Sequence, residues 1–159
     1  MMKRVVSTLA ALCVPAMLAA CGSPASDISF NAPAGWKSTP GVFGRFQMWI
    51  TGDKAADRQM LILVRGDQTM RMEDSQSFSG TRGMHDFKHA TIMLCGSQHA
   101  DYFVGRGEGT NGGQRVQQTV EGVTTTIGSS KYAALYIRPV SMRADAQAEA
   151  SLHSICPKG

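Results

Sequence analysis

The chain carries little charge and few prolines. Asp, Glu, Lys and Arg make up 18% of its 159 residues, below the quarter that is usual for soluble domains, and proline occurs only 6 times. With 17 glycines and a hydrophobic fraction of 43%, this composition argues against a disordered tail and a collagen-like repeat. The length is that of one domain large enough to bury a core.

The sequence also lacks several signatures of function. The basic residues from Lys37 to Lys158 occur singly, so the basic stripe of a nucleic-acid-binding protein is missing, and we expect no nucleic-acid partner. There is no Gly-x-Ser-x-Gly, no Ser-x-x-Lys and no evident carboxylate pair in a cleft-forming context. We therefore predict that the protein is not an enzyme and uses no cofactor.

The first 20 residues have the composition of a secretory signal peptide. Met1-Met2-Lys3-Arg4 is a basic start, and residues 5–20 are uncharged and end in small side chains. A membrane-spanning helix needs about 20 apolar residues, whereas this run is shorter and contains Pro15. Removal of the leader would lower the excess of basic over acidic residues from +4 to +2, because Lys3 and Arg4 leave with it.

The end of this leader, Leu18-Ala19-Ala20-Cys21, resembles the lipobox of bacterial lipoproteins. The resemblance implies cleavage before Cys21 and attachment of acyl chains to that residue, which would hold the protein at a membrane. Gly22, where an inner-membrane lipoprotein has Asp, implies an outer-membrane protein facing the periplasm. Residues 1–20 are then the signal, and residues 21–27 an anchor with a short tether. The alternative is an ordinary cleaved signal peptide.

Two of the four cysteines remain once Cys13 leaves with the leader and Cys21 carries lipid. Cys95 and Cys156 in an oxidising compartment are expected to form a disulfide. The chain has no Cys-x-x-Cys, and Cys95 follows an apolar run that suggests a buried strand end. The alternative is a reactive thiol at Cys95, which has His89 and His99 on either side.

The remaining residues predict an α+β domain over residues 28–159, an antiparallel sheet packed by a C-terminal helix. The predicted helix begins near Ser141 as its cap, presents Ala148 and Leu152 on one face and stops at Pro157. A second helix over residues 68–77 is possible. The predicted strands cover residues 28–30, 45–51, 59–65, 89–95, 102–104, 115–127 and 131–138.

The segment from Ile28 to Trp36 resembles the opening of the Mog1/PsbP-like fold, in which an apolar residue is followed by Phe, Pro, Gly and Trp. Phe30, Pro33 and Trp36 carry this resemblance, and the order of the predicted elements agrees with it. It implies a binding or assembly protein whose partner is a protein or an envelope component, since members of this group mostly have such roles. A shared fold does not assign one role.

Two motifs point to ligands. Gly107-Glu108-Gly109-Thr110-Asn111-Gly112 fits the dinucleotide-binding pattern, but a strand follows it instead of a helix, so we predict a flexible loop and no nucleotide. His85 and His89 have a spacing that on a helix could hold zinc or, with nearby methionines, copper. A periplasmic metal-binding protein is therefore the alternative function. The same segment approaches a strand, where the two imidazoles would lie about 13 Å apart.

Overall fold

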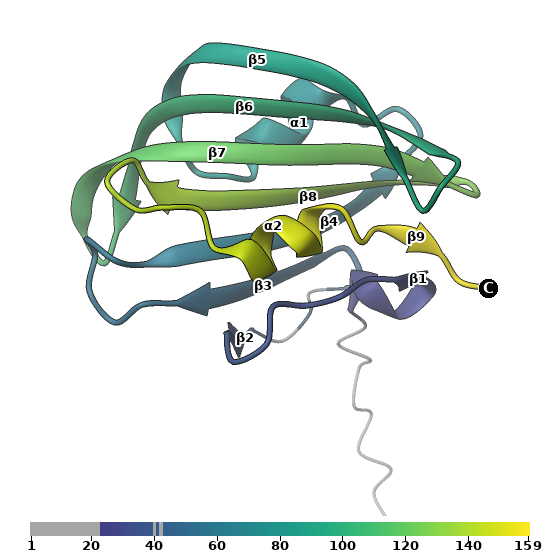
Figure 1. The fold of residues 1–159 in the computed structure, drawn as a ribbon, viewed down its shortest axis with the longest axis horizontal. Coiled ribbons are helices and arrows are strands. Elements are labelled where there is room, and N and C mark those ends of the chain that lie inside the picture. The colour runs from purple at the N-terminus through teal and green to yellow at the C-terminus, as the bar shows by residue number, and fades with distance from the viewer. Residues whose placement is uncertain (1–22, 40, 42) are drawn as a thin grey trace, which may run out of the picture.

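A computed structural model describes residues 23–39, 41 and 43–159 (Figure 1). Its main feature is an antiparallel sheet of seven strands among these residues, in the order β2-β3-β4-β8-β7-β6-β5. The strands are β2 (Lys37–Ser38), β3 (Phe46–Thr51), β4 (Gln59–Asp67), β5 (Arg82–Leu94), β6 (Gln98–Asn111), β7 (Gln114–Ile127) and β8 (Ser130–Pro139). The lipobox residues lie outside the described part of the chain.

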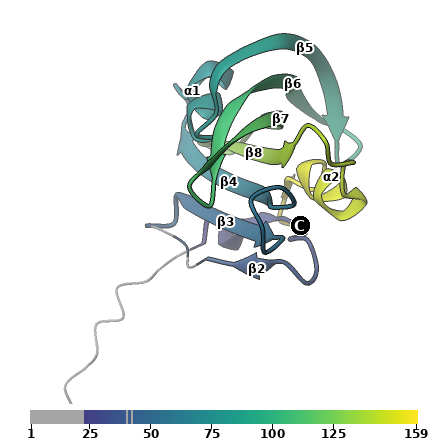
Figure 2. The same ribbon diagram turned by 90° about the vertical axis from the view of Figure 1, so that its left-hand side faces the viewer.

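Short helices cover both faces of this sheet. Helix α1 (Met72–Ser77) and helix α2 (Ala146–Leu152) lie on opposite sides of it (Figure 2). A 3-10 helix, η1 (Pro24–Asp27), precedes β1 (Ile28–Ser29), which pairs with β9 (Cys156–Pro157). The expected α+β architecture is confirmed at this coarse level. Within the described ranges, no helix is both long and apolar enough to cross a membrane.

The core is divided between the two faces. On the face that α2 covers, here called the α2 face, Leu61, Leu63 and Val123 pack with Ala148 and Leu152 of the helix. The opposite face, here called the α1 face, carries a separate cluster that includes Ile62, Phe103, Leu135 and Met70. Because β4 and β8 lie in the middle of the sheet, both faces of their residues are covered, which explains their nearly continuous apolar sequences.

Helix α2 is shorter than the sequence predicts. It begins at Ala146, and its cap is Asp145 instead of Ser141: the Asp145 carboxylate accepts hydrogen bonds from the backbone N–H groups of Gln147 (2.9 Å) and Ala148 (3.1 Å). The helix ends before Pro157, which pairs with Ile28 in the small sheet. The prediction is wrong at both ends because a side-chain cap and a strand pairing compete with helix extension.

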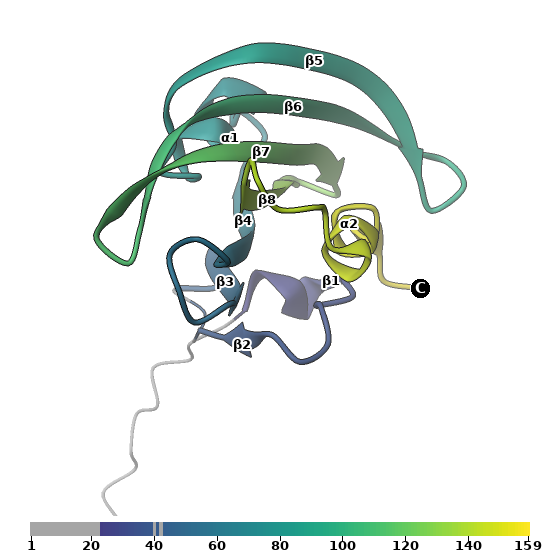
Figure 3. The same cartoon turned by 60° about the vertical axis from the view of Figure 1, so that its left-hand side comes forward.

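Helix α1 and the two strands after it also differ from their predicted bounds. The helix starts at Met72 because Asp67 accepts a hydrogen bond from Thr69 N–H (2.9 Å) and directs the preceding residues into a turn. Strands β5 and β6 contain 13 and 14 residues, far more than the predicted segments 89–95 and 102–104. β5, β6 and β7 bend together along their length (Figure 3).

Glycines in β6 allow this part of the sheet to pack. Gly105 and Gly109 are buried, and a Cβ at Gly105 would lie 2.9 Å from the ring of Phe87. A Cβ at Gly109 would overlap the side-chain amide of Gln118, which in turn accepts a hydrogen bond from the Thr81 hydroxyl (2.8 Å). These contacts require residues without a side chain at alternate positions of the strand.

Candidate functional site

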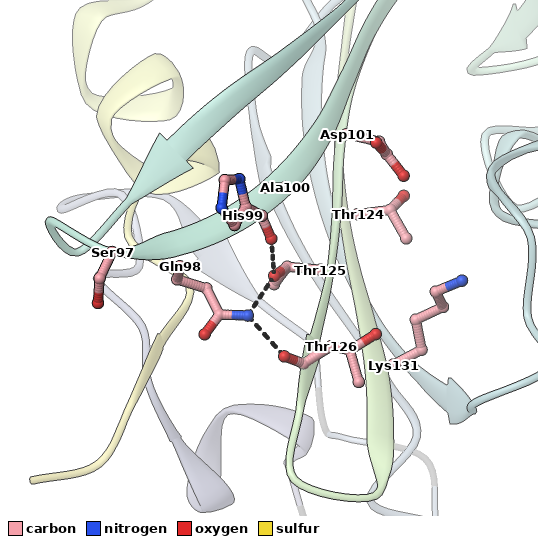
Figure 4. Close-up of a pocket in the computed structure, with 9 residues that line it drawn as sticks. All are labelled: Ser97, Gln98, His99, Ala100, Asp101, Thr124, Thr125, Thr126 and Lys131. Carbon is pink, nitrogen blue, oxygen red and sulfur yellow. Dashed lines mark hydrogen bonds between the residues drawn. The ribbon is translucent and has the colours of Figure 1, made fainter.

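Two adjoining hollows lie beside α1 and are the candidate binding site. One, of about 500 Å³, is lined by residues 97–101, residues 124–126 and Lys131 (Figure 4). The other, of about 620 Å³, is lined by residues 71–73, 89–91 and 101–102 together with Lys131. Asp101 and Lys131 belong to both, so α1, β5, β6, β7 and β8 all contribute to a continuous recess.

The register of the sheet places the charged side chains of this recess on the α1 face. Ala100 and Tyr132 pack in the core of the α2 face, and their neighbours Asp101 and Lys131 therefore point the other way. Figure 4 shows Asp101, Thr124 and Lys131 on the same side of the strands. Asp101 and Thr124 are directly paired residues of β6 and β7. The three side chains thus come together from three adjacent strands.

A hydrogen-bond clamp fixes the end of the recess near the β5–β6 turn. The Gln98 amide donates to the Thr125 hydroxyl (2.9 Å) and to the backbone carbonyl of Thr126 (2.6 Å), and the Thr125 hydroxyl donates to the carbonyl of His99 (2.8 Å). These bonds join β6 to β7, as the dashed lines in Figure 4 show. Thr125 pairs with Ala100 and Tyr132 of the α2 face, so these bonds hold β6 and β7 together at this end of the recess from the opposite face.

The recess offers charges and a hydroxyl that the described residues leave unpaired. Neither Asp101 nor Lys131 forms an ion pair with any residue that the structure describes. Thr124 is 2% exposed, and its Oγ1 has no hydrogen-bond partner among these residues. Arg71 and Glu73 add one charge of each sign on the helix side. This arrangement suits a polar ligand that carries both donors and acceptors.

A separate polar cluster is buried on the α2 face. Arg138 and Glu121 form an ion pair at 2.8 Å, with side chains only 15% and 9% exposed. The Tyr102 hydroxyl donates to Glu121 (3.2 Å), and burial together with the Glu121 charge raises the pKa of Tyr102 to about 12. The Arg138 guanidinium lies over the ring of Tyr136, 5.5 Å from its centroid. All four side chains thus interact within the fold, which indicates a structural role.

The predicted disulfide is present. Cys95 and Cys156 are bonded, with their Cα atoms 5.9 Å apart. Cys95 directly follows the last residue of β5, and Cys156 lies in β9. The predicted burial of Cys95 at this strand end is wrong, because the residue lies in the turn between β5 and β6 and is exposed. The alternative of a reactive thiol at Cys95 is wrong, because its sulfur is consumed by the bond. Cys21, the predicted lipidation site, lies outside the described residues.

The two histidines of the predicted metal alternative have separate neighbours in β5. His85 Nδ1 lies 3.0 Å from the Gly83 carbonyl oxygen, whereas the His89 ring stacks on Phe87 with centroids 5.7 Å apart. Irregularities in the β5–β6 pairing lie on both sides of His85, so the helical spacing does not apply. Among the described residues, no group of three or more His, Cys, Asp or Glu side chains could hold a metal ion.

The methionines and the glycine motif serve packing. Met70 is buried in the α1-face cluster, and Met72 and Met84 pack against it. Gly107 and Gly109 lie within β6, and only Gly112 belongs to the tight turn into β7, where its φ is +54°. The prediction of a flexible loop over this motif is wrong, because the glycines make room for side chains from β5 and β7.

The recess is the feature that the sequence did not predict. Its central residues lie on three consecutive strands and are ordinary polar strand residues. The one signal was the run Thr124-Thr125-Thr126 near the end of β7, and only the pairing of β7 with β6 shows which of these threonines faces the recess. In comparisons with known proteins, no family model matches this chain, and no curated protein is significantly similar to it.

Proposed function

We propose that the protein is a lipid-anchored, non-enzymatic binding or assembly module of the cell envelope, held at the outer membrane and facing the periplasm. The observation that carries this proposal is the disulfide between Cys95 and Cys156 in a chain whose leader ends in Leu18-Ala19-Ala20-Cys21. Disulfides of this kind persist in oxidising compartments, which agrees with an exported protein. The two features are independent, since one depends on the tertiary structure and the other on the leader.

The recess on the α1 face is the proposed binding site. Asp101 and Lys131 offer an anion and a cation within one recess, and neither forms an ion pair with a residue that the structure describes. The Thr124 hydroxyl beside them is buried and has no hydrogen-bond partner among these residues. The exposed edge strand β5 borders it. A polar segment of a neighbouring envelope protein could satisfy these groups and also contact the strand edge.

Kinship with Mog1/PsbP-like proteins is part of the same proposal. Its support is the role of the opening motif in packing: the Phe30 ring lies 5.3 Å from Trp49, and the Trp36 ring lies 6.3 Å from Tyr136. Pro33 between them is buried. The motif thus fastens the N-terminal segment across the α2 face, a structural reason for the spacing of its residues.

Membrane anchoring is tested by Cys21→Ala in the full chain. We expect the protein to leave the membrane fraction and to lose incorporation of radiolabelled palmitate. Cys13→Ala is the matched control, because it removes another cysteine from the same leader and should change neither result. A Cys21→Ala protein that sediments and labels like the wild type would overturn the anchoring proposal.

The binding site is tested by photo-crosslinking in intact envelopes. A photoreactive amino acid at Thr91, an exposed residue lining the recess, is compared with one at Ala150, which is exposed on α2. We expect an adduct from position 91 alone, and its loss when Lys131→Glu reverses the charge within the recess. Identical adducts from both positions, or an adduct insensitive to Lys131→Glu, would contradict the assignment of the recess.

The metal-binding alternative gains no support from the described geometry. His85 and His89 contact different neighbours. Met84 packs against the core, whereas Met93 is 52% exposed.

A further inference from the structure

We infer that the turn at Phe43–Arg45 contacts the surface of the lipid bilayer, so that the domain docks directly on the membrane. This inference rests on the proposed lipid anchor at Cys21. It assigns a membrane-facing surface to the domain and an occupant to that surface, a phospholipid headgroup layer.

The fold begins almost immediately after the proposed anchor at Cys21. The Ser23 hydroxyl accepts a hydrogen bond from Ala25 N–H (3.1 Å) and itself donates to the side-chain amide oxygen of Gln47 in β3. Pro24 is buried, and Asp27 forms an ion pair with Arg65 of β4. The tether predicted over residues 21–27 is therefore folded onto the sheet from Ser23 onward.

The short chain between Cys21 and Ser23 limits how far the domain can lie from the bilayer. Ser23 lies two residues after Cys21, and two residues span at most about 7 Å when fully extended. An acylated Cys21 sits at the level of the lipid headgroups, so Ser23 and the surface around it are held within that distance of the bilayer. The domain has no freedom to stand away from the membrane on a flexible stalk, and one side of it must face the lipid.

The turn at Phe43–Arg45 shares this position near the bilayer, because Arg65 connects it to η1. Arg65 donates its backbone N–H to the carbonyl of Arg45 (2.7 Å), while its guanidinium holds Asp27 of η1. Arg65 also lines a shallow hollow of about 340 Å³ together with Phe43, Gly44 and Arg45. The turn before β3 and the helix after the anchor are thus connected through one residue, Arg65, by its backbone on one side and its side chain on the other.

The side chains of this turn suit the bilayer interface. Phe43 is 87% exposed, the most exposed of the large hydrophobic residues in the described ranges, and its φ of +51° is unusual for a bulky side chain. Its neighbour Arg45 is exposed as well. An aromatic ring beside a cationic side chain fits the bilayer interface, where the ring enters the acyl boundary and the guanidinium meets phosphate. The exposure of this apolar ring is explained if lipid covers it.

The experiment uses the purified, lipidated protein with Phe43→Cys carrying an environment-sensitive fluorophore. It is reconstituted in vesicles of phosphatidylethanolamine and phosphatidylglycerol, with a quencher on the lipid near the headgroup. The control is the same label at Gln114→Cys, an exposed residue at the opposite end of the strands. The nine residues of β4 alone separate the two ends by about 30 Å.

We expect a blue-shifted emission and loss of roughly half or more of the fluorescence at position 43, and little change at position 114, because interfacial side chains enter the bilayer by only about 5–10 Å. Equal quenching at the two positions, or none at either, would overturn the inference. Protection of position 43 in native envelopes but not in pure lipid vesicles would also overturn it, because the occupant would then be a protein.

The same preparation also shows whether the lipid anchor or only the docking surface is assigned wrongly. A chain that is recovered without acyl groups and does not associate with the vesicles contradicts the proposed lipid anchoring. A chain that is acylated and bound to the vesicles, but unquenched at position 43, leaves the anchoring intact and contradicts only the docking surface.

Discussion

The two faces of the sheet are built in different ways. The α2 face is closed: Leu152, Ile155 and Ala148 are fully buried against it, and the disulfide fixes the end of β5 to the strand that follows α2. The α1 face carries a six-residue helix, a cluster partly filled by methionines, and the open recess with Asp101 and Lys131. One face is a sealed core, and the other is only half covered.

This difference indicates where stability and binding reside. Burial of branched and aliphatic side chains and a covalent link stabilise the α2 face. The α1 face instead leaves the charged side chains Asp101 and Lys131 open to a ligand, and its methionines tolerate adjustment of packing. We expect substitutions on the α2 face to lower the stability of the whole domain, and substitutions in the recess to affect binding.

The largest expected effect comes from removing the disulfide. Cys95→Ser combined with Cys156→Ser should lower the free energy of unfolding by about 4 kcal/mol, because the 61-residue separation is no longer closed in the unfolded chain. Urea unfolding of oxidised and mutant protein measures this. Wild-type protein reduced with dithiothreitol is the control and should match the mutant. A loss below about 1 kcal/mol would show that the α2 face does not depend on its covalent link.

A glycine pair tests the tightness of packing on the α1 face. A Cβ at Gly122 would lie 2.1 Å from the ring of Phe103 and 2.9 Å from Leu135, so Gly122→Ala should cost about 1–3 kcal/mol in the free energy of unfolding. Gly66→Ala is the matched control, since the added methyl would meet the flexible side chain of Met70. Denaturant unfolding should show a smaller change there. Equal losses would mean that the methionines are as rigid as the aromatic core.

The smallest expected effect is a pH dependence on the α2 face. Burial and the Glu121 charge raise the pKa of Tyr102 from its ordinary value of 10.0 to about 12, so the fold favours the protonated phenol. This contribution to stability is fully present below pH 10 and is lost as the pH rises toward 12. Tyr102→Phe should therefore show a shallower loss of stability between pH 9 and 12, measured by unfolding at each pH. Burial also raises the pKa of Tyr132 and Tyr136, and these shifts remain in the variant. Identical slopes would contradict the role assigned to Tyr102.

Local signals in the sequence predicted the closed part of the molecule well. The apolar runs of β4 and β8 are recognisable without any knowledge of their partners, because strands buried on both faces have nearly continuous hydrophobic sequences. Composition and compartment were sufficient to predict the pairing of Cys95 with Cys156. The cap at Asp145 was missed because two polar residues could have capped the helix, and tertiary packing chose between them.

The open part of the molecule depended on the register between consecutive strands, which single-strand patterns do not reveal. Strands β5 and β6 are rich in polar residues and glycine, which individually disfavour strands, and they extend to 13 and 14 residues because the sheet supplies neighbours. The sequence pattern around Gly109 predicts a loop, and only the structure shows that the Gln118 side chain fills the space beside this residue. The sequence by itself therefore determined the strand-rich core and its final helix, since hydrophobic patterning is a local property, and it supplied the two cysteines that the tertiary structure brings together. Only the tertiary structure decided that Asp101, Thr124 and Lys131 meet in one recess, because register between strands fixes which side chains share a face.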